Sequence, residues 1–185
     1  MSCIIINEMR KEKKGEIRII GGKWKGKKIY FDLSNDLRPT PDRAKETLFN
    51  WLGQDLSEMY CLDLFSGTGA LGLEAFSRGA KKVTFVEIDG NHLNSIIKNA
   101  KNFPYEEFSF FKRDANRFIK KSDKYDIIFA DPPYGHINIK EFADEALKKI
   151  NSNGILVVEC SEKESVEGCD KITKFGDTKL LYWKK

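Results

Sequence analysis

An apolar strand that runs through a glycine-rich turn into a helical pattern is the feature that most restricts the fold of this 185-residue chain. It extends from Cys61 to Ala75 and contains Gly67, Gly69 and Gly72. Glycine allows a sharp turn and close approach of a ligand, and the first N–H groups of the following helix have no partner within that helix. We therefore expect a cofactor cradle at this turn.

The remaining pattern alternates strands with helices. Strands are expected at 61–65, 82–87, 108–112, 125–130 and 154–159, and helices at 41–52, 70–78, 90–101, 115–120 and 139–150. This alternation predicts an α/β fold, a doubly wound, mostly parallel, Rossmann-like sheet. The last two apolar runs, 171–175 and 178–183, flank a Gly-Asp turn and are expected to form an antiparallel C-terminal hairpin at the sheet edge.

Glu87 ends the next apolar run, 20 residues after Gly67. An acid at this position can accept hydrogen bonds from ribose hydroxyls. The three glycines also satisfy the dinucleotide fingerprint G-x-G-x-x-G, so an NAD enzyme stays an alternative on this motif alone.

A second motif, Asp131-Pro132-Pro133-Tyr134, directly follows the apolar run 125–130. Each proline lacks an N–H group, so this turn has more acceptors than backbone donors. The Asp131 carboxylate and the Pro132 carbonyl are predicted to accept both hydrogens of an exocyclic base amine, while the Tyr134 ring stacks on the base. A plain strand followed by a proline turn is the alternative. In a parallel sheet this turn and the glycine turn open on the same edge.

Together these motifs resemble class I S-adenosylmethionine-dependent methyltransferases that modify exocyclic amines, and more closely the RsmD family, which methylates guanine N2 in bacterial small-subunit (16S) ribosomal RNA. The resemblance rests on the motifs at 18–26, 37–52, 63–78, 87–89 and 131–134. It implies S-adenosylmethionine as the cofactor and ribosomal RNA, either naked or within a small-subunit particle, as the partner. A DNA or protein amine methyltransferase and a non-catalytic RNA-binding module are the alternatives.

The resemblance also implies roles for single residues. Gly67 and Gly69 would cradle the methionine part of the cofactor, and the backbone of Phe65 would border it. Asp63 is expected either to orient the loop or to accept from the cofactor's amine. Asp114 matches the family position that contacts the adenine amine, although an N-cap for helix 115–120 explains it equally well. The expected cofactor-binding residues are Asp63, Phe65, Gly67, Gly69, Glu87 and Asp114; the expected catalytic residues are Asp131, Pro132 and Tyr134.

Basic charge is concentrated near the N-terminus. Between Arg10 and Lys28 there are nine Lys or Arg and two Glu, a net charge of +7, whereas the whole chain carries +4. Residues 1–36 are expected to form a basic arm or hairpin that neutralises RNA phosphates, preceding a methyltransferase domain at 37–185. Trp24 is expected to stack on an unpaired base, and Arg38 and Arg43 to pair with either an RNA phosphate or the cofactor carboxylate. A solvated tail is the alternative. The expected RNA-binding residues are Arg18, Lys23, Trp24, Lys25, Lys27, Lys28, Arg38 and Arg43.

Other classes of protein lack support in the sequence. No apolar run approaches the roughly 18 residues that a membrane span needs, and the N-terminus has no signal-peptide order, so a cytoplasmic location is expected. The four cysteines show no C-x-x-C spacing, and the two histidines are 44 residues apart, so no metal site is expected. A monomer is expected.

Overall fold

The computed structural model describes residues 14–33 and 40–185. The described chain begins with a hairpin of β1 (Lys14–Arg18) and β2 (Lys28–Asp32). Seven further strands follow: β3 (Tyr60–Leu64), β4 (Lys82–Glu87), β5 (Phe108–Lys112), β6 (Tyr125–Ala130), β7 (Ile150–Ser161), β8 (Lys171–Phe175) and β9 (Thr178–Lys184). The helices are α1 (Asp42–Leu52), α2 (Ala70–Ser77), α3 (Gly90–Ala100), α4 (Ala115–Lys121) and α5 (Ile139–Lys148), with a 3₁₀ turn, η1, at Tyr105–Glu107.

The seven later strands form one sheet in the order β5-β4-β3-β6-β7-β9-β8. Neighbouring strands within the group β3 to β7 run parallel to each other, whereas β9 is antiparallel to both β7 and β8. The predicted fold class and the antiparallel C-terminal hairpin are confirmed. Strand order reverses at β3, the position where open α/β sheets place their ligands.

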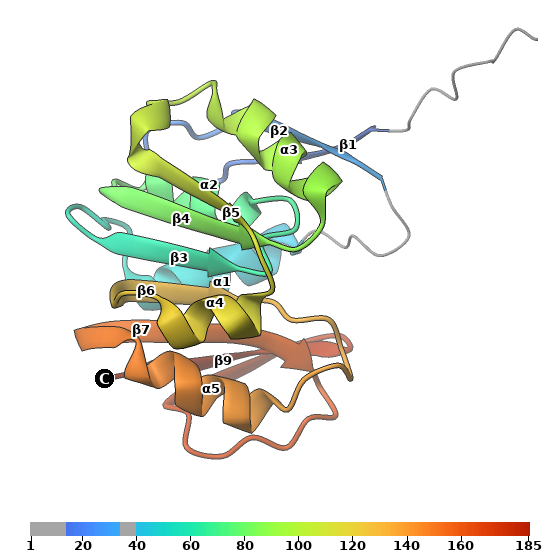
Figure 1. Ribbon diagram of the computed structural model, residues 1–185, viewed down its shortest axis with the longest axis vertical. Helices are drawn as coiled ribbons and strands as arrows, with labels where there is room; N and C mark the ends of the chain where they lie inside the picture. Colours follow the sequence, from blue (N-terminus) through green and yellow to red (C-terminus); the bar gives the residue numbers. More distant parts are fainter. Residues whose placement is uncertain (1–13, 34–39) are drawn as a thin grey trace, which may run out of the picture.

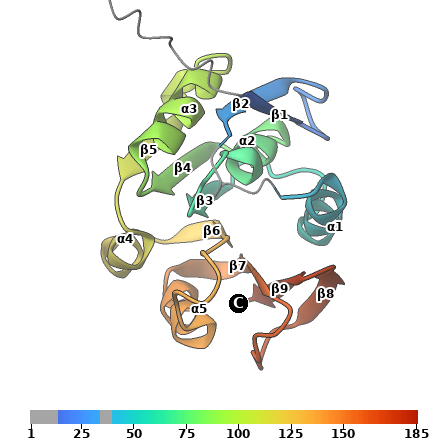
Figure 2. The same ribbon diagram turned by 90° about the vertical axis from the view of Figure 1, so that its right-hand side faces the viewer.

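Helices cover both faces of the sheet. In Figure 1, α4 and α5 lie in front of it and α1 and α2 behind it, and the turned view of Figure 2 separates the same two layers. Residues of α1, α2 and α3 share one apolar core with β1 and β2, and residues of α4 and α5 share the other. The loops that lead from the parallel strands to the next helices therefore lie at the carboxyl ends of these strands.

Most element boundaries lie within two residues of the prediction, and the starts of α1 and β7 differ for identifiable reasons. Helix α1 takes Pro41 as its N-cap without a side-chain cap, and the Pro41 carbonyl accepts from the N–H groups of Ala44 and Lys45. The helix therefore begins at Asp42, one residue later than expected. Strand β7 begins at Ile150 rather than at 154, with an irregular register against β6 and a positive φ of 65° at Asn153. Asn153, which directly precedes the expected strand, thus lies inside β7.

The basic hairpin is packed onto the sheet domain. Ile19 and Ile29 are each 1% exposed and belong to the core beneath α1 and α2. The Ile20 N–H donates to the Glu74 carboxylate at 2.8 Å. A Cβ atom at Gly22 would lie 1.9 Å from a backbone oxygen of α2, so only glycine fits there. The boundary expected between residues 36 and 37 lies outside the described residues.

Candidate active site

Four predicted site segments meet where β3, β4, β5 and β6 end. These strands are adjacent and parallel, so the residues that follow Leu64, Val86, Lys112 and Ala130 open on one edge. The glycine turn after β3 and the Asp-Pro-Pro-Tyr turn after β6 are on neighbouring strands. The expected convergence of the two motifs is therefore what the topology produces.

The glycine turn has an unusual backbone. Phe65, Gly67 and Gly69 have φ values of 57°, 51° and 74°. For phenylalanine this left-handed conformation is strained, and such strain concentrates at functional sites. The Phe65 ring packs on Phe142 of α5, with centroids 5.7 Å apart, so its side chain belongs to the core while its backbone forms the turn.

Ser66, which sequence reasoning missed, fixes this turn to β4. Its hydroxyl donates to the Asp63 carbonyl at 2.6 Å and accepts from the Val86 N–H at 3.0 Å, and its own N–H donates to the Val86 carbonyl. The chain position alone gave no signal for these contacts because Val86 lies 20 residues away. Ser66 therefore holds the turn against the strand that carries Glu87.

Asp63 is buried and orients the start of α2. Its Oδ2 accepts from the Gly72 N–H at 2.9 Å, and the residue is 3% exposed. Burial, followed by the nearby Glu87 charge, raises its pKa to about 8, although the Gly72 hydrogen bond opposes this rise. Of the two expected roles, orientation of the loop has a visible contact, and acceptance from a cofactor amine stays a prediction.

Glu87 connects the glycine turn to the loop after β4. Its Oε2 accepts from the Gly67 N–H and its Oε1 from the Asp89 N–H, both at 2.8 Å. Each carboxylate oxygen can accept more than one hydrogen bond, so both oxygens retain capacity for ribose hydroxyls. Ile88, which sequence reasoning also missed, is 64% exposed beside it and offers an apolar surface for an adenine ring.

Two aspartates at this edge cap helices. Asp114 accepts from the Arg117 N–H at 2.9 Å and is the N-cap of α4. Asp89 accepts from the N–H groups of Asn91 and His92 and caps α3, which lowers its pKa. The N-cap alternative for Asp114 is thus what the structure contains, and its contact with adenine stays a prediction.

The second turn presents the predicted catalytic residues. Pro132 is buried, Pro133 is exposed and Tyr134 is 43% exposed, so its ring is accessible for stacking. Burial raises the pKa of Asp131 well above its usual value, and the charges of Glu159 and Asp63 raise it further. A carboxyl group with a strongly raised pKa is typical of a reactive site.

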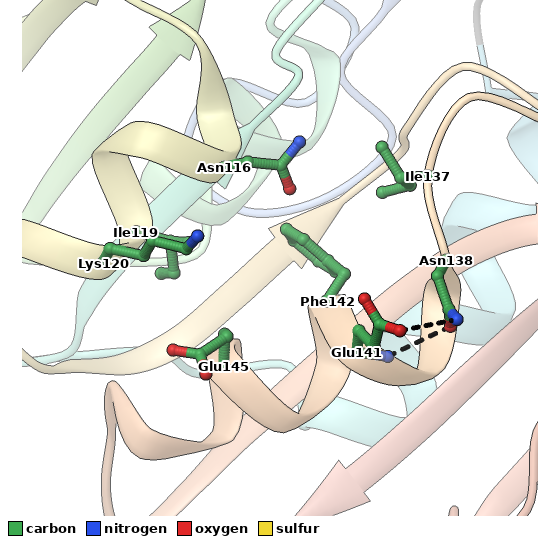
Figure 3. Close-up of a pocket in the computed structure, with 8 residues that line it drawn as sticks. All are labelled: Asn116, Ile119, Lys120, Ile137, Asn138, Glu141, Phe142 and Glu145. Carbon is green, nitrogen blue, oxygen red and sulfur yellow. Dashed lines mark hydrogen bonds between the residues drawn. The ribbon is translucent and has the colours of Figure 1, made fainter.

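A pocket of about 280 Å³ lies beside this edge, between α4 and α5. Figure 3 shows the side chains of Asn116, Ile137 and Phe142 turned toward the space between the two helices. The Asn138 side chain accepts from the Glu141 N–H at 3.2 Å and caps α5. The pocket is thus bounded by the segments that follow Asp114 and Tyr134.

The basic hairpin places its turn away from this edge. The N–H groups of Lys23 and Trp24 donate to Ser77 at the last residue of α2, while the Lys27 ammonium donates to the Asn102 carbonyl after α3. The site lies at the opposite ends of these helices. The turn is therefore separated from the cofactor loop by the length of α2, about 12 Å for eight residues.

Trp24 has aromatic partners within the fold. Its ring is stacked on Phe76 at 5.2 Å and touches Phe103 edge-on, and the residue is only partly buried, so its stacking on an RNA base stays a prediction. A solitary aromatic among lysines gave no sign of these partners, which lie over 50 residues away.

The other residues expected to bind RNA have varied environments. Arg18 and Lys28 both pair with Glu16, at 3.6 and 3.0 Å. Lys25 and Arg43 are exposed, and Arg43 lies in the first turn of α1. Arg38 lies outside the described residues. RNA contact by this set stays a prediction.

The described residues lack two other kinds of feature. Residues 14–33 and 40–185 contain no group of three or more side chains arranged to hold a metal ion. Within those same ranges, no helix is long and apolar enough to span a membrane.

Comparison with known proteins gives consistent matches over most of the chain. A family model described as "Conserved hypothetical protein 95" matches residues 17–183. The Ribosomal RNA small subunit methyltransferase D of Haemophilus influenzae is 42% identical over 159 residues, covering 82% of this chain and 81% of that protein. The Escherichia coli protein of the same name is 40% identical over 171 residues, covering 83% and 86%. The solved structure of the Escherichia coli protein yhhF superposes with a TM-score of 0.81 at 32% identity, covering 92% of this chain and 98% of that one.

Proposed function

The chain belongs to the Conserved hypothetical protein 95 (RsmD) family, and we propose that it transfers a methyl group from S-adenosylmethionine to the N2 amine of a guanine in small-subunit (16S) ribosomal RNA. The observation that carries this proposal is the juxtaposition of two turns on the neighbouring strands β3 and β6. The first is the glycine turn, in which Phe65, Gly67 and Gly69 have left-handed backbone conformations. The second turn carries Asp131 and the accessible ring of Tyr134.

The residues of the first turn suit S-adenosylmethionine. Gly67 and Gly69 allow the backbone to approach the methionine part closely. Glu87 is positioned for the ribose hydroxyls, and the exposed Ile88 side chain for one face of the adenine. Asp63 is a buried carboxyl group that would accept from the methionine amine. When bound, the cofactor supplies an electrophilic methyl group on a cationic sulfur.

The residues of the second turn act on the substrate amine. A guanine N2 lone pair is conjugated with the ring, so this nitrogen is a poor nucleophile. Hydrogen bonds from the amine to the Asp131 carboxylate and the Pro132 carbonyl favour the pyramidal, positively charged nitrogen of the transition state. The Tyr134 ring holds the base by stacking, which requires that the base leave any helix stack. Asp131 accepts in its ionised form, so its raised pKa makes activity increase with pH.

The basic hairpin is assigned to RNA phosphates at a distance from the target base. Lys25 and the side chains of its neighbours are displayed beyond the ends of α2 and α3, away from Asp131. Such contacts add affinity without reading sequence. We further assign the activity to a monomer in the cytoplasm, acting on ribosomal RNA either naked or within a small-subunit particle.

A transfer assay tests the reaction class. Radiolabelled S-adenosylmethionine is incubated with the protein and with ribosomal RNA, small-subunit particles, DNA or protein, and label is expected in the RNA. Mass spectrometry of small-subunit ribosomal RNA from cells lacking the gene should show one missing N2-methylguanine. Label in DNA or protein alone would instead support the alternative amine methyltransferases, and an unchanged RNA profile would refute the RNA assignment.

Calorimetry tests the cofactor. S-Adenosylmethionine is expected to bind and NAD is not. The Asp131→Ala variant is the matched control, because at about pH 5, where the raised pKa of Asp131 favours its neutral form, it should bind S-adenosylmethionine nearly as the wild type does while losing most methyl transfer.

A further inference from the structure

Glu159 is a buried carboxylate that no step above uses. It lies near the end of β7 and is 7% exposed. Its Oε2 atom has no hydrogen-bond partner. Among the described residues it is the only buried side-chain oxygen or nitrogen atom in this state. Leaving such a group unpaired is costly, so an unpaired buried acceptor in a native protein needs an explanation, and a catalytic or binding role is one.

The register of the sheet puts Glu159 beside Asp131. Ala130 of β6 pairs with Val158 of β7, and both side chains belong to the core under α4 and α5. Because side chains alternate along strands, Asp131 and Glu159 project together toward the opposite face. Their proximity is consistent with the charge of Glu159 raising the pKa of Asp131.

The surroundings of Glu159 belong to the substrate turn. Tyr134 and Thr178 interact with its side chain and oppose the rise in pKa that burial causes. The carboxylate is thus next to both the residue that would hold the amine and the residue that would stack on the base. In contrast, the described residues give Glu159 no lysine or arginine salt-bridge partner within 4.0 Å.

We propose that Glu159 is a specificity-determining residue, whose Oε2 accepts the hydrogen on the ring nitrogen next to the methylated amine. This inference rests on the proposed function and adds the reason for choosing guanine. In guanine the exocyclic amine adjoins N1–H, a donor. In adenine and in cytosine the ring nitrogen adjoining the amine is an acceptor, so its lone pair would face the carboxylate. A site that hydrogen-bonds a substrate N–H strongly rejects analogues that lack it.

The test uses 2-aminopurine, which keeps the 2-amine but has an unprotonated N1. The target guanine, located first by mass spectrometry, is replaced in synthetic small-subunit RNA, and both RNAs are offered naked and assembled with small-subunit proteins. Single-turnover methylation is measured at mildly alkaline pH, which favours the ionised carboxylate. Wild type should prefer guanine by about 10³-fold or more. Equal rates on the two RNAs would overturn the proposal without any variant.

Glu159→Gln then identifies the residue responsible. Glutamine can either accept from N1–H or donate to an unprotonated N1, so the preference should fall to about tenfold or less. A preference that stays as large as in wild type, with both rates lowered together, would show that Glu159 only positions Tyr134 and would overturn the proposal. Glu162→Gln is the matched control: Glu162 is exposed, pairs with Lys174 at 2.7 Å and should leave the preference unchanged. If wild type methylates neither RNA while binding S-adenosylmethionine, the proposed function itself fails.

Discussion

Asp63→Asn is expected to change how the stability of the protein depends on pH. The carboxyl has a pKa of about 8 in the folded state, against 3.8 for an ordinary aspartate. The difference is about 4 pK units, which corresponds to ~5 kcal/mol as an upper limit. Because the folded pKa is raised, the folded state keeps a proton that the unfolded chain has lost. The contribution of this proton to the free energy of unfolding is fully present below about pH 4 and decreases as the pH rises toward 8.

The asparagine amide retains an oxygen that can accept from the Gly72 N–H, but it does not titrate. Relative to Asp63→Asn, the wild-type free energy of unfolding should therefore decrease by ~1.4 kcal/mol for each pH unit within that window. Urea unfolding of both proteins between about pH 4 and pH 8 measures this difference. Parallel stability curves would refute the reasoning, because they would show that Asp63 is ionised in the folded state throughout. Ser57→Ala, which removes an exposed hydroxyl that contacts Asp55, should leave the pH dependence almost unchanged and serves as the control.

Three further predictions concern the site and the hairpin. Glu87→Gln should weaken S-adenosylmethionine binding in calorimetry by about 1 to 3 kcal/mol, and Glu87→Ala should in addition lower the unfolding free energy, because the N–H groups of Gly67 and Asp89 lose their acceptor; an unaltered affinity in both variants would contradict the ribose role. Asp131→Ala should abolish most single-turnover methylation while cofactor affinity measured at about pH 5 stays near normal. Tyr134→Phe should retain more activity than Tyr134→Ala, and equal losses in the two variants would contradict a stacking role for the ring. Neutralising the four hairpin lysines together should weaken RNA binding and flatten its salt dependence without changing cofactor affinity. These lysines are Lys23, Lys25, Lys27 and Lys28. Identical salt dependence in the variant and the wild type would show that the basic hairpin does not bind phosphates.

The order of strands and helices could be predicted because each element has its own local signal. The apolar run before Gly67 and the proline turn after Ala130 mark strand ends, and right-handed connections then fix their common edge. Long-range packing gave no such signal. The stacking of Trp24 on Phe76 joins residues more than 50 positions apart, so a residue expected at an RNA surface is part of the core boundary.

Glu159 could have been identified from the sequence as an unusual residue. It interrupts an apolar run that begins at Ile155, and a lone acid inside a buried strand needs a partner. Its relation to Asp131, however, depends on the register between β6 and β7, which includes an irregularity after Tyr125. The residue type alone could have indicated that Glu159 needs a partner, and the pairing of β6 with β7 shows that Asp131 lies beside it.

The buried acids also make cofactor binding depend on pH. Asp63 and Asp131 both have raised pKa values, caused first by burial and then by other carboxylates at the same edge. A bound cation favours their ionised forms, so binding of a cation should release protons and should strengthen as the pH rises toward the folded pKa values. S-Adenosylmethionine carries a sulfonium charge that S-adenosylhomocysteine lacks, while the two share the methionine ammonium and the ribose. Calorimetry of both ligands between about pH 5 and pH 7.5 should show the S-adenosylmethionine affinity rising more steeply, with the excess reduced in Asp131→Asn. Equal slopes for the two ligands would mean that these carboxylates do not face the sulfonium, and the placement of the methyl group beside Asp131 would have to be abandoned.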